Sequence, residues 1–110
     1  MAQKRKGIKT SFSSEEKYLP RSKKEKRLIQ AFSLLNEPKD IANFLRDLMT
    51  LPEIEEFANR LEIARLIAQG KSYDEISRLL EVSTTTVTRV GHWLYRGCGG
   101  YDKIIKKLKV

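Results

Sequence analysis

Residues 83–89 read Ser-Thr-Thr-Thr-Val-Thr-Arg, a run of hydroxyl groups that ends in a long cation and contains no acid. Hydroxyl groups can bond to phosphates or base edges, threonine methyls can contact thymine methyls, and arginine can bond guanine through two parallel hydrogen bonds. A helix face that serves only solubility more often carries Glu, Lys and Gln, because threonine is a weak helix former. Six residues of the run are therefore predicted to contact duplex DNA: Ser83, Thr84, Thr85, Thr86, Thr88 and Arg89.

The spacing of apolar residues around this run predicts a helix-turn-helix over residues 73–92. When Tyr73 is counted as the first of twenty positions, the inward positions four, eight, ten, fifteen and eighteen are all apolar. Two short helices that cross steeply also need a small residue where they touch, and Ser77 stands there. The alternative is an ordinary helical hairpin with a polar outer face. The five inward residues are Ile76, Leu80, Val82, Val87 and Val90.

Serine residues are predicted to cap both helices of the motif. Ser72 followed by Glu75 matches a capping box, and Ser83 directly precedes the second helix. Position nine departs from the commonest pattern, because glycine suits the left-handed backbone that the turn requires and Glu81 stands there instead. A non-glycine residue is tolerated at this position in working motifs.

Further candidate contacts lie at the edges of the motif. Lys71 and Tyr73 are predicted to contact DNA, although Tyr73 could instead pack beside Leu51. His92, the single histidine, is expected to be a surface residue near the phosphates, and Arg96 could contact phosphate or cap a helix end.

Helical periodicity elsewhere predicts an all-α fold of about six helices. Ser22 with Glu25 predicts the start of the first helix, Pro38 suits a first turn, and Gly70 suits a helix end. A basic, flexible arm is expected before the helical domain. The expected ranges are 1–21 for the arm, 22–110 for the domain with its helix-turn-helix at 72–95, and helices at 22–35, 38–49, 53–69, 72–80, 84–95 and 101–108.

The third of these helices is apolar around most of its girth, which indicates a central place in a core or an interface. One side is expected to bury Ile54, Phe57, Leu61 and Ala64, while Ile63, Leu66 and Ile67 lie around the other. A chain of 110 residues leaves an all-α fold little interior. A second copy that covers the apolar faces is therefore expected.

The net charge of +8 is concentrated at the two ends of the chain. Residues 1–30 hold ten Lys and Arg against three acids, and residues 102–110 hold four against one, while the body between them is close to neutral. Basic ends on a compact body often bind nucleic acid phosphates, although solvated tails would have the same composition.

Several classes of protein have little support in the sequence. A single cysteine, Cys98, excludes an internal disulfide and makes a cysteine metal site implausible. No apolar run is long enough for a membrane span and no secretion signal is evident, so a cytoplasmic location is expected. No phosphate loop and no nucleophile–base pair can be assembled, so no enzyme is expected.

A longer stretch resembles the tryptophan repressor family, in particular its small TrpR-like branch of the YerC/YecD type. The stretch is LPEIEEFANRLEIARLIAQGKSYDEISRLLEVSTTTVTRV at residues 51–90, and weaker similarity extends from about residue 28 to about residue 108. The resemblance implies an intertwined homodimer of six-helix subunits. Its two helix-turn-helices would enter successive major grooves, roughly 34 Å apart.

The resemblance also implies a possible ligand pocket. The family's namesake holds an amino-acid corepressor between two arginines, which Arg60 and Arg89 match, and a pocket threonine, which Thr86 matches. Val90 stands where the pocket has glycine, and Trp93 where it has the serine that binds the ligand's amino group. Valine and indole would fill that space and remove a polar partner, so no tryptophan corepressor and no other cofactor is expected.

The single tryptophan is expected to pack in the core. An alternative is that the Trp93 indole occupies the corepressor cleft itself and keeps the DNA-binding surface permanently competent.

Two functions of different classes follow. The first is a homodimeric transcriptional regulator, a repressor, that binds double-stranded DNA at an inverted repeat. The second is a protein-interaction module whose helix-turn-helix docks on a transcription partner such as polymerase. Binding that weakens steeply with salt would favour the first. RNA binding is less favoured, because the aromatic residues lie in apolar stripes and not on a stacking surface.

Overall fold

The computed structural model describes residues 17–108, and within this range it contains six helices and no strand. The predicted all-α class is confirmed. Most of the basic arm predicted for residues 1–21 lies outside the described residues. The helices are α1 (Lys23–Ser33), α2 (Pro38–Leu48), α3 (Leu51–Ala68), α4 (Tyr73–Leu80), α5 (Thr84–Arg96) and α6 (Gly100–Lys107).

The chain divides into two compact units, and the division falls within α3. Among the described residues, one unit is Tyr18–Phe57, with α1, α2 and the beginning of α3. The other begins at Ala58 and holds the rest of α3 with α4, α5 and α6.

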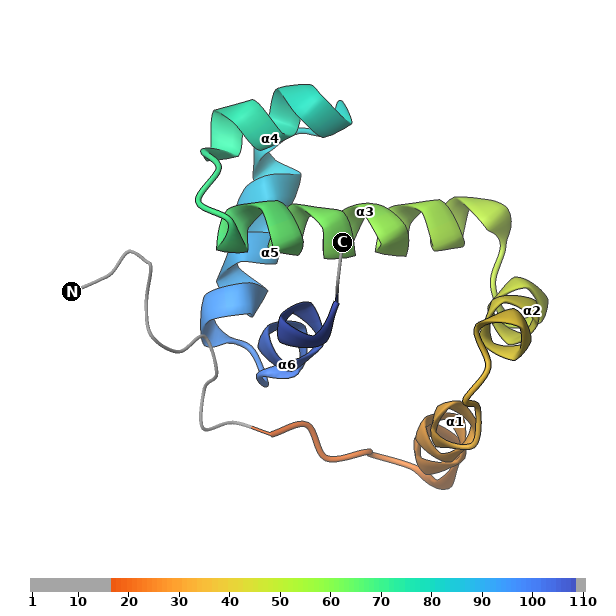
Figure 1. Ribbon diagram of the computed structural model, residues 1–110. Helices are drawn as coiled ribbons and strands as arrows, with labels where there is room; N and C mark the ends of the chain where they lie inside the picture. Colours follow the sequence, from red (N-terminus) through yellow and green to blue (C-terminus); the bar gives the residue numbers. More distant parts are fainter. Residues whose placement is uncertain (1–16, 109–110) are drawn as a thin grey trace. The chain divides into compact units, whose positions relative to one another are not determined.

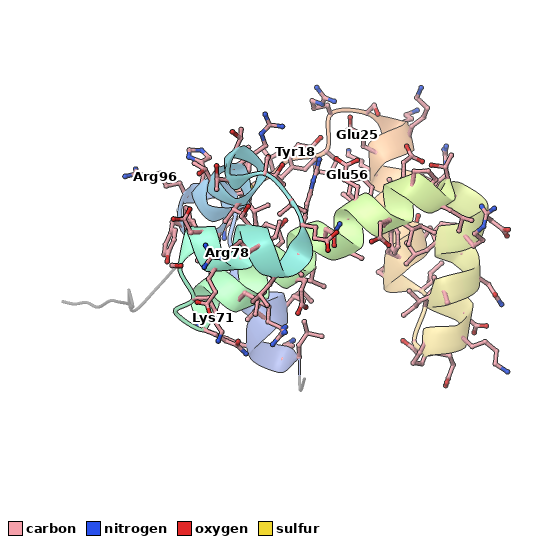
Figure 2. The ribbon with its side chains drawn as sticks, turned by 90° about the horizontal axis from the view of Figure 1, so that it is seen from above. Tyr18, Glu25, Glu56, Lys71, Arg78 and Arg96 are labelled. Atoms are coloured by element: carbon pink, nitrogen blue, oxygen red, sulfur yellow. The ribbon has the colours of Figure 1, made fainter. Side chains whose placement is uncertain are left out.

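Helix α1 begins at a serine cap, beside which Tyr18, Arg21 and Glu25 form a hydrogen-bonded group called here the α1 clasp. The Ser22 hydroxyl accepts a hydrogen bond from the Glu25 backbone N–H at 3.2 Å, as predicted. The Glu25 carboxylate accepts hydrogen bonds from the Tyr18 hydroxyl and from the backbone N–H and Nε of Arg21. These bonds lower the pKa of Glu25 to about 2, the Arg21 backbone bond first and the Tyr18 bond second. Tyr18 and Arg21 were expected in the arm, but both side chains are bonded to Glu25 of α1. Figure 2 shows Tyr18 beside Glu25.

Helices α2 and α3 begin with a proline near the first turn. Pro38 starts α2 as predicted, because its fixed φ suits a first turn and its missing N–H would have had no helical partner. The expectation that Leu51 and Pro52 precede α3 is wrong, because the helix includes both. Thr50 and Glu53 form a reciprocal cap: the Glu53 carboxylate accepts from the Thr50 N–H at 2.9 Å, and the Thr50 hydroxyl accepts from the Glu53 N–H at 3.2 Å.

The unit Tyr18–Phe57 buries none of its apolar stripes within one chain. Neither α1 nor α2 contains a buried residue, although both are amphipathic. Phe32 of α1 and Phe44 of α2 pack edge to face with ring centroids 5.2 Å apart. The side chains of Ile29 and Leu48 remain about half exposed.

The unit that begins at Ala58 contains the buried core. In Figure 1, α5 crosses α3 near the C-terminal end of α3, with α4 close to the start of α5 and α6 close to its end. Helix α3 supplies half of the buried residues, and α4 and α5 supply the rest. The buried apolar residues are Ile63, Ala64, Leu66, Ile67, Ile76, Val87, Val90 and Leu94.

The predicted inward side of α3 is therefore only partly right. Ala64 is buried, but Phe57 is 42% exposed and Leu61 only half-buried, while Ile63 and Ile67 face the core. The reason is that α4 and α5 pack only on the C-terminal part of this long helix, so its periodicity extends beyond the surface that one chain can cover. Gly70 ends the segment as predicted, with a left-handed φ of 93°.

The α1 clasp predicts a loss of helix stability in acid. A carboxyl whose folded pKa is depressed stabilises the fold above its ordinary pKa of 4.5, and that stabilisation is lost as the pH falls towards 2. Circular dichroism of thermal unfolding should show the wild type losing stability across this window. Glu25→Gln should show a weaker dependence, whereas Glu37→Gln, at a helix start without a side-chain cap bond, should follow the wild type. Equal slopes for all three would contradict the role of the clasp.

Candidate nucleic-acid interface

Helices α4 and α5 form the predicted helix-turn-helix. All five predicted inward residues face the core: Ile76 and Val87 are fully buried, Val90 is 4% exposed, and Leu80 and Val82 pack at the edge. This burial offsets the weakness of two short helices, which would be marginal alone. The motif is therefore a rigid part of the unit that begins at Ala58.

The turn between the helices adopts the left-handed backbone that its position requires. Glu81 has φ 57° and ψ 46°, and it is the only described non-glycine residue with positive φ. Ser77 compensates for the missing glycine. Its carbonyl accepts from the N–H of Glu81 and, at 3.1 Å, from that of Val82, while its hydroxyl donates to the Val82 carbonyl. The predicted small residue thus also bonds the turn closed.

Both predicted serine caps are present. The Ser72 hydroxyl accepts from the Glu75 N–H at 3.1 Å, and the Ser83 hydroxyl accepts from the Thr86 N–H at 3.0 Å. The Thr86 hydroxyl lies 2.9 Å from the Ser83 hydroxyl, so two of the predicted contact residues also bond to each other. The Glu75 carboxylate faces Lys71 across the first turn of α4, with 3.8 Å between Nζ and Oε2.

The outer face of α5 is exposed along its whole length and carries no acid. The predicted contacts Thr84, Thr85, Thr88 and Arg89 are exposed, as is Ser83 before them. Thr86 is half-buried. The structure therefore brings the predicted hydroxyls and the cation together on one accessible surface.

His92 and Arg96 lie on the same exposed face of α5 as the predicted contacts. His92 follows Thr88 by four residues and Arg96 follows His92 by four, so helical spacing continues the exposed face beyond Arg89. Arg96 is the last residue of α5, Arg78 lies on α4, and Lys71 lies in the loop before α4 (Figure 2). The helical period itself was the signal for His92 and Arg96. Arg78 is exposed on α4 and was not predicted.

Tyr73 packs against α5. A Cβ on Gly91 would lie 2.3 Å from the Tyr73 hydroxyl and 3.5 Å from Ile67, so glycine is what allows α4 to approach so closely here. Burial raises the pKa of Tyr73, and the nearby Tyr95 adds to the effect. The hydroxyl that was considered for phosphate is thus occupied in helix packing.

The residues of the possible ligand pocket occupy different environments. Val90 is 4% exposed among the core residues, whereas Arg89, the residue before it, is exposed to solvent. Arg60 lies near α6, where its charge partly offsets the rise that burial causes in the pKa of Tyr101. Within one chain, Val90 is therefore part of the core, whereas Arg89 and Trp93 are exposed.

Trp93 is not a core residue, so that expectation is wrong. Its side chain is 52% exposed, and its ring meets the His92 ring edge to face at 5.6 Å. Gly97 lies beside the indole, since a Cβ there would stand 3.0 Å from the ring and 2.3 Å from the Trp93 carbonyl. The inward positions of α5 are already filled by Val87, Val90 and Leu94, which leaves the indole at the edge of the exposed face.

Residues 17–108 contain neither a candidate membrane span nor a candidate metal site. No helix there is long and apolar enough to cross a membrane. Within the same range, no group of three or more His, Cys, Asp or Glu residues is arranged to hold a metal ion.

Comparison with known proteins identifies the family. The family model described as Trp repressor protein matches residues 23–109. The chain belongs to the Trp repressor family. It is similar to YerC of Bacillus subtilis (strain 168), an uncharacterized protein, with 34% identity over 87 residues that cover 76% of this chain and 84% of YerC. It also matches the crystal structure of a TrpR-like protein from Eubacterium eligens ATCC 27750 with a TM-score of 0.75 and 28% identity, over 79% of this chain and 90% of that one.

The family is one of DNA-binding regulators, which is consistent with the exposed, acid-free face of α5. The helix-turn-helix lies entirely within the matched residues.

The contact between Gly91 and Tyr73 can be tested by a double-mutant cycle. Gly91→Ala should destabilise the fold by about 1–3 kcal/mol, because the new methyl overpacks a close helix contact. Tyr73→Phe removes the nearest atom and should recover part of the loss, leaving a coupling of about 0.5–3 kcal/mol in urea unfolding. Gly100→Ala, which would meet nothing within 4 Å, is the control and should be nearly neutral. Additive effects of the two substitutions would contradict the contact.

Proposed function

We propose that this protein binds specific double-stranded DNA sites as a homodimeric transcriptional regulator and acts there as a repressor. The observation that carries the proposal is the outer face of α5, which is exposed, free of acids and held by a packed and capped helix-turn-helix. Recognition helices contact base edges with their N-terminal residues. Ser83, Thr84, Thr85 and Thr88 are assigned to phosphates and thymine methyls, and Arg89 to a guanine.

Contacts to the phosphate backbone are assigned to the edges of this face. Lys71 and Arg78 on the side of α4, and Arg96 at the end of α5, are exposed cations that would hold the motif in register. Thr86 contributes through Ser83, to which it is bonded.

The homodimer is supported by the apolar surface that one chain leaves uncovered. Leu28, Ile29 and Phe32 of α1 and Leu48 of α2 are all more than a third exposed, and α3 adds Phe57. A second copy of the chain would cover these residues, as the membership in this family suggests. Two copies related by a two-fold axis would bind an inverted repeat with half-sites one helical turn, roughly 34 Å, apart.

A protein-interaction module remains the second candidate because Leu79, on α4, is 60% exposed. In that case the helix-turn-helix would dock on a transcription partner, and purified protein would show no preference among duplex sequences.

Selection from a random duplex pool tests both the specificity and the symmetry. We expect enrichment of a palindrome with fixed half-site spacing, because two identical recognition helices read the two half-sites. A promoter that overlaps the selected site should be transcribed less when the protein is expressed. Failure to enrich any motif would reject sequence-specific binding, and increased transcription would reject repression.

Arg89→Ala should weaken binding to the selected site by about 1–3 kcal/mol and relax the preference at one guanine of each half-site. Lys39→Ala is the matched control, because it removes one exposed positive charge from a different helix, α2. Fluorescence anisotropy with the selected site and with single-base variants measures both effects. An equal loss for the two variants would mean that Arg89 acts only through net charge.

Tryptophan should not change the affinity for DNA. The argument is that Val90 already packs in the core and that an indole, Trp93, stands beside the exposed face of α5. Titration of the selected site with and without L-tryptophan measures the effect, with D-tryptophan as the control for unspecific effects. A clear gain in affinity with the L-isomer alone would establish a corepressor and overturn this part of the proposal.

A further inference from the structure

We propose that the N-terminal half of α1 is a second DNA contact, which binds phosphates without reading the sequence. The inference rests on the proposed DNA binding and adds a contact surface outside the helix-turn-helix. The surface, called here the α1 basic face, consists of Lys23, Lys24, Lys26 and Arg27.

The four cations occupy one side of the helix. At 100° per residue, they fall within an arc of roughly 160°, and the apolar residues Leu28, Ile29 and Phe32 fall on the opposite side. All four are exposed. Within residues 17–108, none of the four forms an ion pair, whereas Arg21, Arg65, Lys71 and Lys106 each pair with an acid. The α1 basic face is therefore available to an anionic partner.

The placement of these charges opposes the stability of the helix. A helix favours acids in its first turn and cations in its last turn, because the N-terminus is the positive end of the helix dipole. Helix α1 has one acid, Glu25, in its first turn, but all four of its cations also lie in its first two turns and its last turn has no basic residue. Lys23 is also next to Lys26 and Arg27 at spacings of three and four residues, where like charges repel. Such an arrangement is expected where a partner, and not the fold, requires the charge.

The clasp at the start of α1 keeps its one acid away from this face. Glu25 is the only acid between residues 17 and 36. Its carboxylate is bonded to Tyr18 and Arg21, its side chain is 29% exposed, and its helical position is on the far side from Lys23 and Arg27. The α1 basic face is thus unopposed by an acid of its own helix.

Duplex DNA fits this face better than an anionic membrane. A helix that binds a membrane surface inserts its apolar side, but the apolar side of α1 is the surface that the second copy of the chain would cover in the proposed homodimer. The same chain also carries the acid-free outer face of α5, which is the proposed DNA-binding surface. The phosphates of a duplex form a regular array, so each of the four cations could pair with a phosphate.

The test compares two triple variants with equal loss of charge. Lys23→Gln/Lys24→Gln/Lys26→Gln changes the α1 basic face. Lys103→Gln/Lys106→Gln/Lys107→Gln changes α6, where two of the cations lie in the last turn and so favour the helix. Affinity for the selected site, and for a random duplex of the same length, is measured from about 0.05 to 0.2 M salt, together with thermal unfolding.

The α1 variant should lose about tenfold or more in affinity for both duplexes, with a salt slope smaller by roughly 0.9 for each lost phosphate contact. Its melting temperature should nevertheless rise by about 1–4 °C, since a repulsion has been removed. The α6 variant should keep most of its affinity and melt at the same or a lower temperature. A rise in stability together with a loss of affinity is a result that a purely structural role for these lysines would not produce.

Four outcomes would overturn the inference while leaving the proposed function intact, provided that the wild type binds duplex DNA. The first is an unchanged salt slope in the α1 variant, and the second is an equal loss of DNA affinity in the α1 and α6 variants. The third is a change in the sedimentation mass of the α1 variant, which would assign the cations to a contact between copies of the chain. The fourth is an α1 variant that binds DNA as tightly as the wild type but no longer binds phosphatidylserine vesicles that the wild type does bind. This result would assign the cations to a membrane. A wild type that binds no duplex at all would reject the proposed function itself.

Discussion

The burial of four side chains, Ile63, Ile76, Val87 and Leu94, is the interaction on which the DNA-binding surface depends. They come from three helices and are fully or almost fully removed from solvent. Helix α4 has only eight residues and helix α5 begins with three threonines, so neither would be a stable helix by itself. Because α3 supplies the surface on which both pack, the outer face of α5 is held in a fixed orientation relative to α4.

Close approach between these helices depends on small residues at two points. Gly91 leaves room for the Tyr73 side chain. Ser77, within α4, bonds to the turn: its carbonyl accepts from the N–H groups of Glu81 and Val82, and its hydroxyl donates to the Val82 carbonyl. The left-handed Glu81 costs on the order of 1–2 kcal/mol of backbone strain, which the surrounding bonds and the small core offset. The motif is therefore specified by packing and turn geometry together, and not by a glycine at the turn.

The remaining apolar surface connects the fold to the proposed homodimer. One chain covers only the C-terminal part of α3 and leaves the stripes of α1 and α2 open to solvent. Exposed apolar surface on this scale is costly in water and marks an interaction site. The same helix α1 carries apolar residues on one side and the α1 basic face on the other, so a single helix could serve both assembly and the binding of phosphates.

Local features were determined by the sequence itself. The serine caps at Ser22, Ser72 and Ser83, the proline start at Pro38 and the five inward positions of the helix-turn-helix were all predicted, because each depends on residues within a few positions of one another. The six helices follow from the same short-range patterns, and the exposed hydroxyls and Arg89 follow from the period of α5.

Only the tertiary structure decided which apolar and aromatic residues are covered. Trp93 lies at the surface, Tyr73 packs on Gly91, and Phe57 stays exposed, since burial depends on which helix crosses which, and helical periodicity does not contain that information. Helix α3 also begins before Pro52, which suggested a break, because Thr50 and Glu53 form a reciprocal cap at its start. The residues on the outer face of α5 could thus be predicted from local sequence. The surroundings of Val90 and Trp93, near the end of that helix, depend on contacts between helices that are distant along the chain.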